Sequence, residues 1–206
     1  NSGKDPGHPF ATIDYAIGRC TADNGDVIFV CPGHAENVTA TLTLTLDIAG
    51  VRVIGIGQGA SRPTLSLTAV ASVISVTAAS CSLENLLLKA EHDNTIMVDI
   101  DATDCSVVAC EFRSRIAATA REFVTAIDIN GGAANACDRT RVINCLFYSP
   151  TAGATQAIEL GEIADSVEIV GCQAWGDYGA APIHNPTGFV LTRLSVRDCI
   201  LENTQT

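Results

Sequence analysis

The stretch Cys105-Ser-Val-Val-Ala-Cys-Glu-Phe112 contains a pattern that recurs along the chain: apolar, any, apolar, any two residues, apolar, any, apolar. Four further copies run over Cys81–Leu88, Thr140–Phe147, Val167–Ala174 and Leu194–Leu201. Alternation places every second side chain of a strand on the same face, and the two-residue gap lets the chain turn a corner while both halves point inward. Each copy therefore predicts two short strands on either side of a bend.

The residue that precedes the second half of each copy suits a tight corner. These residues are Asn85, Ala109, Asn144, Gly171 and Asp198, and all but the alanine are types that adopt left-handed backbone angles at low cost. The second halves recur every 24 to 35 residues, and a looser sixth copy starts at Val51. A repeat of this length indicates a solenoid, because one unit cannot bury its apolar face alone.

Each repeat contains only strand-like segments, so the predicted fold class is all-β. Because crossovers between parallel strands are right-handed, we expect a right-handed, single-stranded parallel β-helix of about six or seven turns. Residues 10–206 would form this one domain, and residues 1–9, rich in glycine, proline and polar side chains, would form an exposed N-terminal arm. Apolar residues at helical spacing after Thr12 predict a short helix that caps the first turn.

The composition argues against several classes of protein. Hydrophobic residues make up 47% of the chain and charged residues 17%, which is unlike a disordered protein, and no apolar run approaches the ~20 residues of a membrane span. The net charge of −11 disfavours binding to nucleic acid, which needs clustered lysine and arginine. We therefore expect proteins, cations or neutral glycans as partners, unless the acidic surface only keeps a β-rich protein soluble.

Four of the nine cysteines, Cys110, Cys145, Cys172 and Cys199, occupy the same inward slot of successive copies. Neighbouring strands lie ~4.8 Å apart, whereas a disulfide needs Cβ atoms ~3.8 Å apart. We therefore expect reduced, buried thiols that pack as small apolar groups. No Cys-x-x-Cys pair or nearby His pair occurs, so we expect no zinc site. We also expect no other resident metal and no cofactor.

The start of the chain carries a recognisable segment: Gly3-Lys-Asp-Pro-Gly-His-Pro-Phe-Ala-Thr-Ile-Asp-Tyr-Ala-Ile17, then Gly25-Asp-Val-Ile-Phe-Val30, Pro32-Gly33 and Ala35-Glu-Asn-Val38. This segment resembles the entry of right-handed parallel β-helix proteins of the pectin-lyase-like superfamily, of the type found among tailed-bacteriophage virion proteins. The resemblance covers about the first 60 residues, and beyond them it rests on the repeat. It implies either enzymes and tailspikes that bind or cut polysaccharide, or proteins that decorate a capsid, because a fold does not settle an activity.

The candidate catalytic residues are Asp99, Asp128 and Glu159, which the repeat places outward on successive turns, with His184 as a further member. Carboxylates on adjacent turns would lie about 5 Å apart and those on alternate turns about 10 Å apart, near the separations of retaining and inverting glycosidases. The same ladder could hold Ca²⁺. No lysine or arginine stands in register beside it, so a solvated acidic face is the alternative interpretation.

A second set of outward positions is apolar and predicts a contact surface. The set consists of Ile54, Leu87, Val108, Ile143, Leu146, Val170 and Ile200. Such a stripe is usually covered by a partner or by the chain's own loops, here the segment 116–124. Since phage β-helices commonly form trimers, the resemblance implies a homotrimer. Trp175 and Tyr178 could stack on a glycan, or could anchor a loop against the coil.

These observations together favour a non-enzymatic virion protein of a tailed phage, a capsid decoration or cement protein or a surface-attachment protein. Its partners would be other copies of itself and phage capsid or tail proteins, with no nucleic acid and no membrane. The alternative is a tailspike-type protein that binds or cuts host surface polysaccharide through Asp99, Asp128 and Glu159. A secreted, carbohydrate-active β-helix is a third hypothesis.

Overall fold

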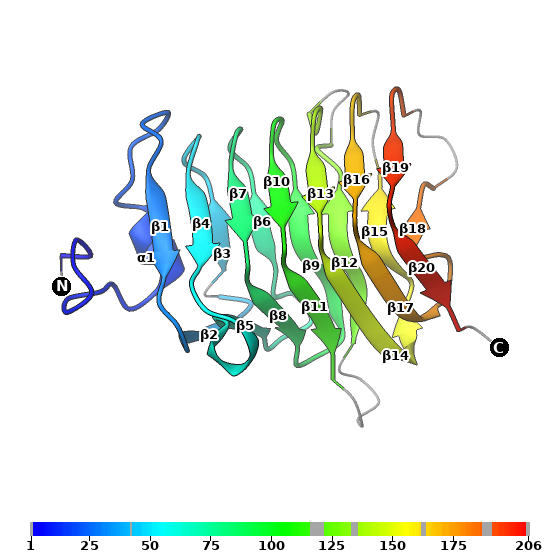
Figure 1. Ribbon diagram of the computed structural model, residues 1–206, viewed down its shortest axis with the longest axis horizontal. Helices are drawn as coiled ribbons and strands as arrows, with labels where there is room; N and C mark the ends of the chain where they lie inside the picture. Colours follow the sequence, from blue (N-terminus) through cyan, green and yellow to red (C-terminus); the bar gives the residue numbers. More distant parts are fainter. Residues whose placement is uncertain are drawn as a thin grey trace.

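The computed structural model describes residues 2–41, 43–115, 122–132, 136–161, 164–186 and 191–204. The chain forms an all-β parallel solenoid of about 6 turns, in which three sheets run side by side along the molecule (Figure 1). Within the described residues the helical content is one α-helix, α1 (Ile13–Ile17), and one 3₁₀ turn, Gly59–Ser61. The predicted β-solenoid is therefore confirmed.

Each turn contributes one strand to each sheet, except that the last described turn supplies strands to sheets A and B only, and the strands stack in parallel register. Sheet A contains β1 (Val27–Val30), β4 (Arg52–Gly55), β7 (Ser82–Glu84), β10 (Ser106–Val108), β13 (Arg141–Ile143), β16 (Glu168–Val170) and β19 (Ser195–Arg197). Sheet B contains β2 (Ala35–Val38), β5 (Thr64–Leu67), β8 (Leu87–Ala90), β11 (Glu111–Ser114), β14 (Leu146–Ala154), β17 (Gln173–Tyr178) and β20 (Ile200–Asn203). Sheet C contains β3 (Leu44–Leu46), β6 (Ile74–Val76), β9 (Asn94–Ile100), β12 (Phe123–Ile129), β15 (Gln156–Leu160) and β18 (Ile183–His184).

The inward slots of the repeated pattern form the core. In the copies that begin at Cys81, Cys105, Thr140 and Val167, every inward side chain is at most 2% exposed. Phe112 stacks on Phe147 of the next turn, with ring centroids 4.9 Å apart. Burying a side chain of this kind contributes roughly 1.5–3 kcal/mol, so the continuous core stabilises the stacked turns. In the copy that begins at Leu194, three of the inward apolar side chains, Leu194, Val196 and Leu201, are exposed.

The corner between sheets A and B has the backbone that the sequence predicts. All five corner residues, Asn85, Ala109, Asn144, Gly171 and Asp198, have positive φ between 52° and 64°. At the first of these corners the side-chain amide of Asn85 donates hydrogen bonds to the carbonyls of Gly55 (2.8 Å) and Gly57 (3.0 Å) in the previous turn. Asparagine therefore supplies both the left-handed conformation and a link between turns.

A second series of left-handed residues lies at the corner between sheets C and A, where the repeated pattern did not predict one. It consists of Asp23, Gly50, Ser80, Asp104, Arg139, Ser166 and Arg193. Serine and arginine are unusual in this conformation. Two members of the series, Arg139 and Arg193, contact carboxylates of the previous turn through their side chains, which gives a reason for arginine at these corners.

All nine cysteines are free. Cys110, Cys145 and Cys172 are buried and donate weak hydrogen bonds to carbonyls of the previous turn, at Leu83 (3.6 Å), Val107 (3.5 Å) and Val142 (3.5 Å) respectively. Burial raises the pKa of the Cys110 thiol to about 12. These three thiols therefore pack as apolar groups, and Cys110 does not ionise near neutral pH.

The N-terminal segment joins the solenoid through α1. Thr12 is the N-cap residue, and its hydroxyl accepts a hydrogen bond from the backbone N–H of Tyr15 (3.3 Å). The backbone N–H of Ile13 donates to the carboxylate of Glu36 in β2 (3.0 Å), and Asp14 accepts from the backbone N–H of Thr45 in β3 (3.2 Å). No helix in the described part of the chain has the length and hydropathy needed to cross a membrane.

Candidate functional site

The carboxylates that the sequence singled out form one ladder on the outer face of sheet C. Asp99 in β9 pairs in register with Asp128 in β12, and Asp128 pairs with Glu159 in β15. The ladder continues to His184 in β18, and Ser75 in β6 precedes it. We call Asp99, Asp128 and Glu159 the carboxylate ladder. The predicted alignment on adjacent turns is therefore present, although its chemical role is a separate question.

The strands of sheet C bend just before the carboxylate ladder. Two consecutive residues of each strand belong to the buried core, namely Met97 and Val98 in β9, Ala126 and Ile127 in β12, and Ala157 and Ile158 in β15. A flat strand would turn one residue of each pair outward. The bend brings polar side chains of the preceding positions against the ladder. The side-chain amide of Gln156 donates hydrogen bonds to Glu159 and to the hydroxyl of Thr125 (2.7 Å).

Three polar atoms at the ladder are buried and have no hydrogen-bond partner. They are Oδ1 of Asp128, Oε1 of Gln156 and Nδ1 of His184, and only two other side-chain atoms of the described residues share this state. Asp128 is 6% exposed and Gln156 is 4% exposed. An unpaired buried polar atom costs about 1–3 kcal/mol, and three such atoms lie at the carboxylate ladder on adjacent turns.

The electrostatic environment of the ladder favours protonated carboxyl groups. Burial, followed by the charges of Glu159 and Asp99, raises the pKa of Asp128 to about 7. Burial and the charge of Asp101 raise the pKa of Asp99 to about 6, and burial also raises the pKa of Asp101. Stacked carboxylates disfavour each other's ionisation in the same way. Burial and the neighbouring carboxylates therefore favour the protonated form of Asp128.

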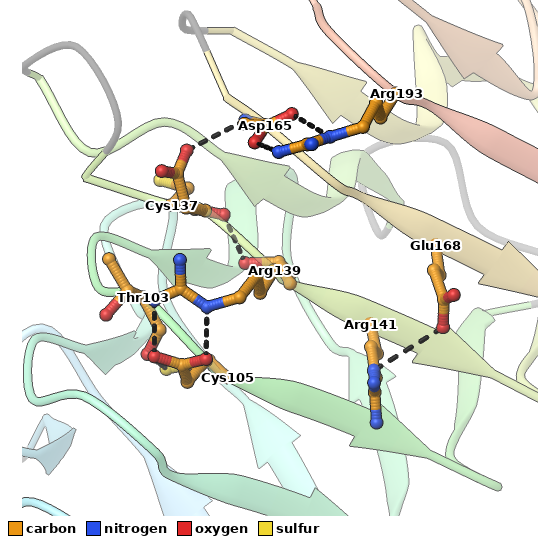
Figure 2. Close-up of polar contacts among 11 residues, drawn as sticks. Thr103, Cys105, Cys137, Arg139, Arg141, Asp165, Glu168 and Arg193 are labelled. Carbon is orange, nitrogen blue, oxygen red and sulfur yellow. Dashed lines mark hydrogen bonds and ion pairs between the residues drawn. The ribbon is translucent and has the colours of Figure 1, made fainter.

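Six carboxylates elsewhere on the described part of the solenoid pair with arginines. Figure 2 shows Arg193 against Asp165, and Arg141 beside Glu168 at 3.4 Å. Arg139 reaches the carboxylate of Asp104 in the previous turn through two hydrogen bonds of 2.6 and 2.7 Å. Further pairs join Arg52 to Glu84, Arg62 to Glu111 and Arg115 to Glu91. Among the described residues, no arginine or lysine forms an ion pair with the carboxylate ladder.

The predicted apolar stripe lies on two neighbouring sheets and is interrupted. Ile54, Val108, Ile143 and Val170 stand in one outward row of sheet A, with Glu84 between the first two. Leu87, Leu146 and Ile200 stand in an outward row of sheet B, alternating with Glu111 and Gln173. Leu146 and Ile200 are exposed, whereas Leu87 is buried. Leu87 is therefore unavailable to a partner. The segment 116–124 was proposed to cover the stripe, and its residues 116–121 lie outside the described residues.

The two aromatic residues proposed for glycan binding occupy different environments. Trp175 is 40% exposed, but Tyr178 is fully buried in the core, where its hydroxyl donates to the carbonyl of Phe147 (3.5 Å). The aromatic partner of Trp175 is Tyr148 of the previous turn, with ring centroids 4.9 Å apart and planes within 13° of parallel. One face of each ring is therefore covered by the other. The aromatic residue beside Trp175 on the outer face of sheet B is therefore Tyr148, and the buried Tyr178 is not available to a glycan.

Tyr148 and Trp175 line a shallow pocket of about 600 Å³ on sheet B, together with Arg113, Leu146 and Ile200. The sequence contained a signal for this pairing, because each ring stands one position beyond the last inward slot of its copy. Gln156 and Thr125 had no such signal, since their approach to Glu159 depends on the bend in sheet C. The pocket and the carboxylate ladder lie on different sheets.

Within the described part of the chain, no group of three or more His, Cys, Asp or Glu side chains converges as metal ligands would. The carboxylate ladder is thus spread along the sheet instead of gathered around one point. Comparisons with protein-family models, with curated proteins and with solved structures found no match to this chain.

Proposed function

We propose that the chain is a non-enzymatic structural protein of a virion, a capsid decoration or cement protein or a surface-attachment protein of a tailed bacteriophage. The proposal includes a right-handed coil of the pectin-lyase-like type, with α1 covering the first turn. It also includes assembly of several copies as a homotrimer and contacts with capsid or tail proteins. The entry segment, residues 3–38, supports this assignment through its resemblance to such virion proteins.

The observation that carries the proposal is the apolar surface on sheets A and B. We call this surface the contact face and define it by Ile54, Val108, Ile143 and Val170 of sheet A and Leu146 and Ile200 of sheet B. Side chains of this kind on an outer face favour burial against a partner. The exposed Trp175 and the pocket of about 600 Å³ beside it extend the same surface.

Solution mass measurement tests the assembly. Light scattering at micromolar concentration should give a trimer for the wild-type chain and a monomer for Leu146→Asp, which places a charge on the contact face. Thr77→Asp adds the same charge at an exposed residue after β6 and serves as the matched control. A wild-type monomer, or equal dissociation of both variants, would refute assembly through the contact face.

The virion assignment itself is tested by counting copies in purified particles of the source phage. A decoration or cement protein should occur in hundreds of copies per particle, because it follows the symmetry of the capsid. A tailspike should occur in a few copies at the tail. Absence from particles would reject the virion assignment altogether.

The second candidate is a polysaccharide-binding or polysaccharide-cleaving protein of the tailspike type. One observation favours it: Asp128, with a pKa raised to about 7 by burial, lies between Asp99 and Glu159 on adjacent turns. A protonated carboxyl beside a second carboxylate is the pair that glycosidases use. If the purified chain releases reducing ends from host polysaccharide and Asp128→Asn does not, the enzyme hypothesis replaces the structural one.

A further inference from the structure

We infer that the outer face of sheet C is a docking surface for an arginine side chain of a partner protein. The carboxylate ladder, Asp99, Asp128 and Glu159, together with Gln156, would receive the guanidinium group. This inference stands apart from the virion assignment, because it concerns a different sheet and a different kind of contact. It commits to a cationic peptide segment as the occupant.

The buried polar atoms of the ladder point to the chemistry of the occupant. Oδ1 of Asp128 and the amide oxygen of Gln156 are both buried, lack partners and can accept hydrogen bonds. Gln156 is not an acidic residue, so its unpaired oxygen is an observation independent of the negative charge. Its amide nitrogen already donates to Glu159 and Thr125, which fixes the amide group against the ladder. The occupant must therefore be a hydrogen-bond donor, and the surrounding carboxylates favour a positive one.

The rest of the solenoid shows that a guanidinium fits between turns. Arg193 bridges to Asp165 of the previous turn (Figure 2). Arg139 bridges in the same way to Asp104 of the previous turn. Strands of adjacent turns lie ~4.8 Å apart, and the planar fork of arginine offers five donors that can serve carboxylates on both sides of that gap. On sheet C the carboxylates are present in register, but this chain supplies no cation to them within the described residues.

A guanidinium also fits the spread of the ladder better than a single metal ion does. A divalent cation requires several oxygens at about 2.3–2.6 Å from one point. The acidic side chains of the described residues do not converge in that way. The planar donors of a guanidinium do not require the acceptor oxygens to converge on one point.

Protonation should regulate this docking. Asp128 faces several titratable or charged groups: Asp99 and Asp101 in and after β9, Glu159 in β15, and Cys137 in the following loop, while Asn130 can stabilise its charged form. His184 continues the same row in β18. An incoming guanidinium favours the ionised carboxylate, so its binding should release a proton from Asp128 below pH 7. Binding should therefore strengthen as the pH rises.

The test uses a short probe peptide with one arginine flanked by glycines, both ends blocked, and the full chain as receptor. Isothermal titration at low salt should detect binding that is about tenfold tighter at pH 8 than at pH 6. Asp128→Asn and Glu159→Gln should each weaken binding at pH 8 at least tenfold, with melting temperatures recorded to show that both variants fold. Asp47→Asn, at an exposed residue after β3, removes the same charge elsewhere and should change binding less than twofold.

Peptides matched to the probe decide the chemistry. Replacing the arginine with its uncharged analogue citrulline should abolish binding, since the cation is lost while the shape is kept. Three outcomes would overturn the inference: no binding of the arginine peptide, equal weakening by Asp47→Asn and Asp128→Asn, or displacement of the peptide by millimolar Ca²⁺. The first would leave the ladder as a solvated acidic face. Equal weakening by the two variants would show that the peptide is held only by the general negative charge of the protein. Displacement by Ca²⁺ would show that the carboxylate ladder is a metal site.

Discussion

Replacing Asp128 with asparagine should remove much of the pH dependence of folding stability. In the folded chain, burial raises the pKa of Asp128 to about 7, whereas an aspartate in an unfolded chain titrates near ~3.9. Between these values the folded chain holds a proton that the unfolded chain has released. Stability is therefore highest below pH ~4 with respect to this group, and is lost as the pH rises through ~7.

The size of the effect follows from the pKa difference. One pKa unit corresponds to about 1.4 kcal/mol, so the full difference for Asp128 is about 4 kcal/mol. Water at the outer face of sheet C screens the neighbouring charges of Glu159 and Asp99, and we therefore expect about half of it, ~2 kcal/mol. For a chain of this length that free energy corresponds to a shift of about 4–8 °C in melting temperature.

The assay is thermal unfolding followed by circular dichroism at pH 5, 6, 7 and 8. Wild type should lose stability from pH 5 to pH 8, and Asp128→Asn should be the more stable of the two at pH 8. Asp104→Asn is the control whose expected effect on stability has the opposite sign. It should be less stable than wild type at pH 8, because Arg139 stabilises the charged form of Asp104 and holds its pKa below its usual range. The reasoning would be refuted if wild type were equally stable at pH 5 and pH 8, or if Asp128→Asn were the less stable protein at pH 8.

Three further predictions concern the packing of the turns. With a thiol reagent such as DTNB, exposed Cys31 should react in the native protein, while buried thiols such as Cys110 should react only on unfolding; rapid reaction of six or more thiols would contradict the predicted core. Gly176→Ala should cost about 1–3 kcal/mol by denaturant titration, because a Cβ there would lie 2.2 Å from the carbonyl oxygen of Ser149. Ala109→Gly should instead raise stability by about 0.5–1 kcal/mol, since alanine is strained at φ 52°, and a loss would show that its methyl group packs usefully.

The corners of the solenoid show which part of the fold is local. Asn144, Gly171 and Asp198 were predictable as left-handed residues, because their types adopt that conformation at low cost wherever they occur. Arg139 and Arg193 were not predictable in the same role. Each is linked to a carboxylate of the preceding turn, so the interaction exists only after the turns have stacked. Local chemistry therefore predicted one corner of each turn and missed the other.

The candidate site also has one feature that the sequence predicts and others that it does not. The register of Asp99, Asp128 and Glu159 follows from a repeat that could be counted in the sequence. The burial of Asp128 and the approach of Gln156 depend on the bend in sheet C, where two consecutive residues turn inward, and strict alternation cannot anticipate that. Leu87 is buried although the repeat places it outward, because an outward position can still be covered by its neighbours.

Most of the described arginines already pair with carboxylates of their own chain, which favours a different protein as the partner at the carboxylate ladder. Of the nine arginines that the structure describes, seven form ion pairs with carboxylates of the same chain, which leaves Arg19 and Arg197. Arg197 follows Val170 in the outward row of sheet A that belongs to the contact face. An Arg197 side chain buried in that interface could not at the same time bind the carboxylate ladder of a neighbouring copy. Asp128→Asn should therefore leave the oligomeric mass of the protein unchanged while Leu146→Asp alters it. If light scattering showed that Asp128→Asn dissociates the oligomer, the ladder would be a contact between copies, and the two surfaces would serve one assembly.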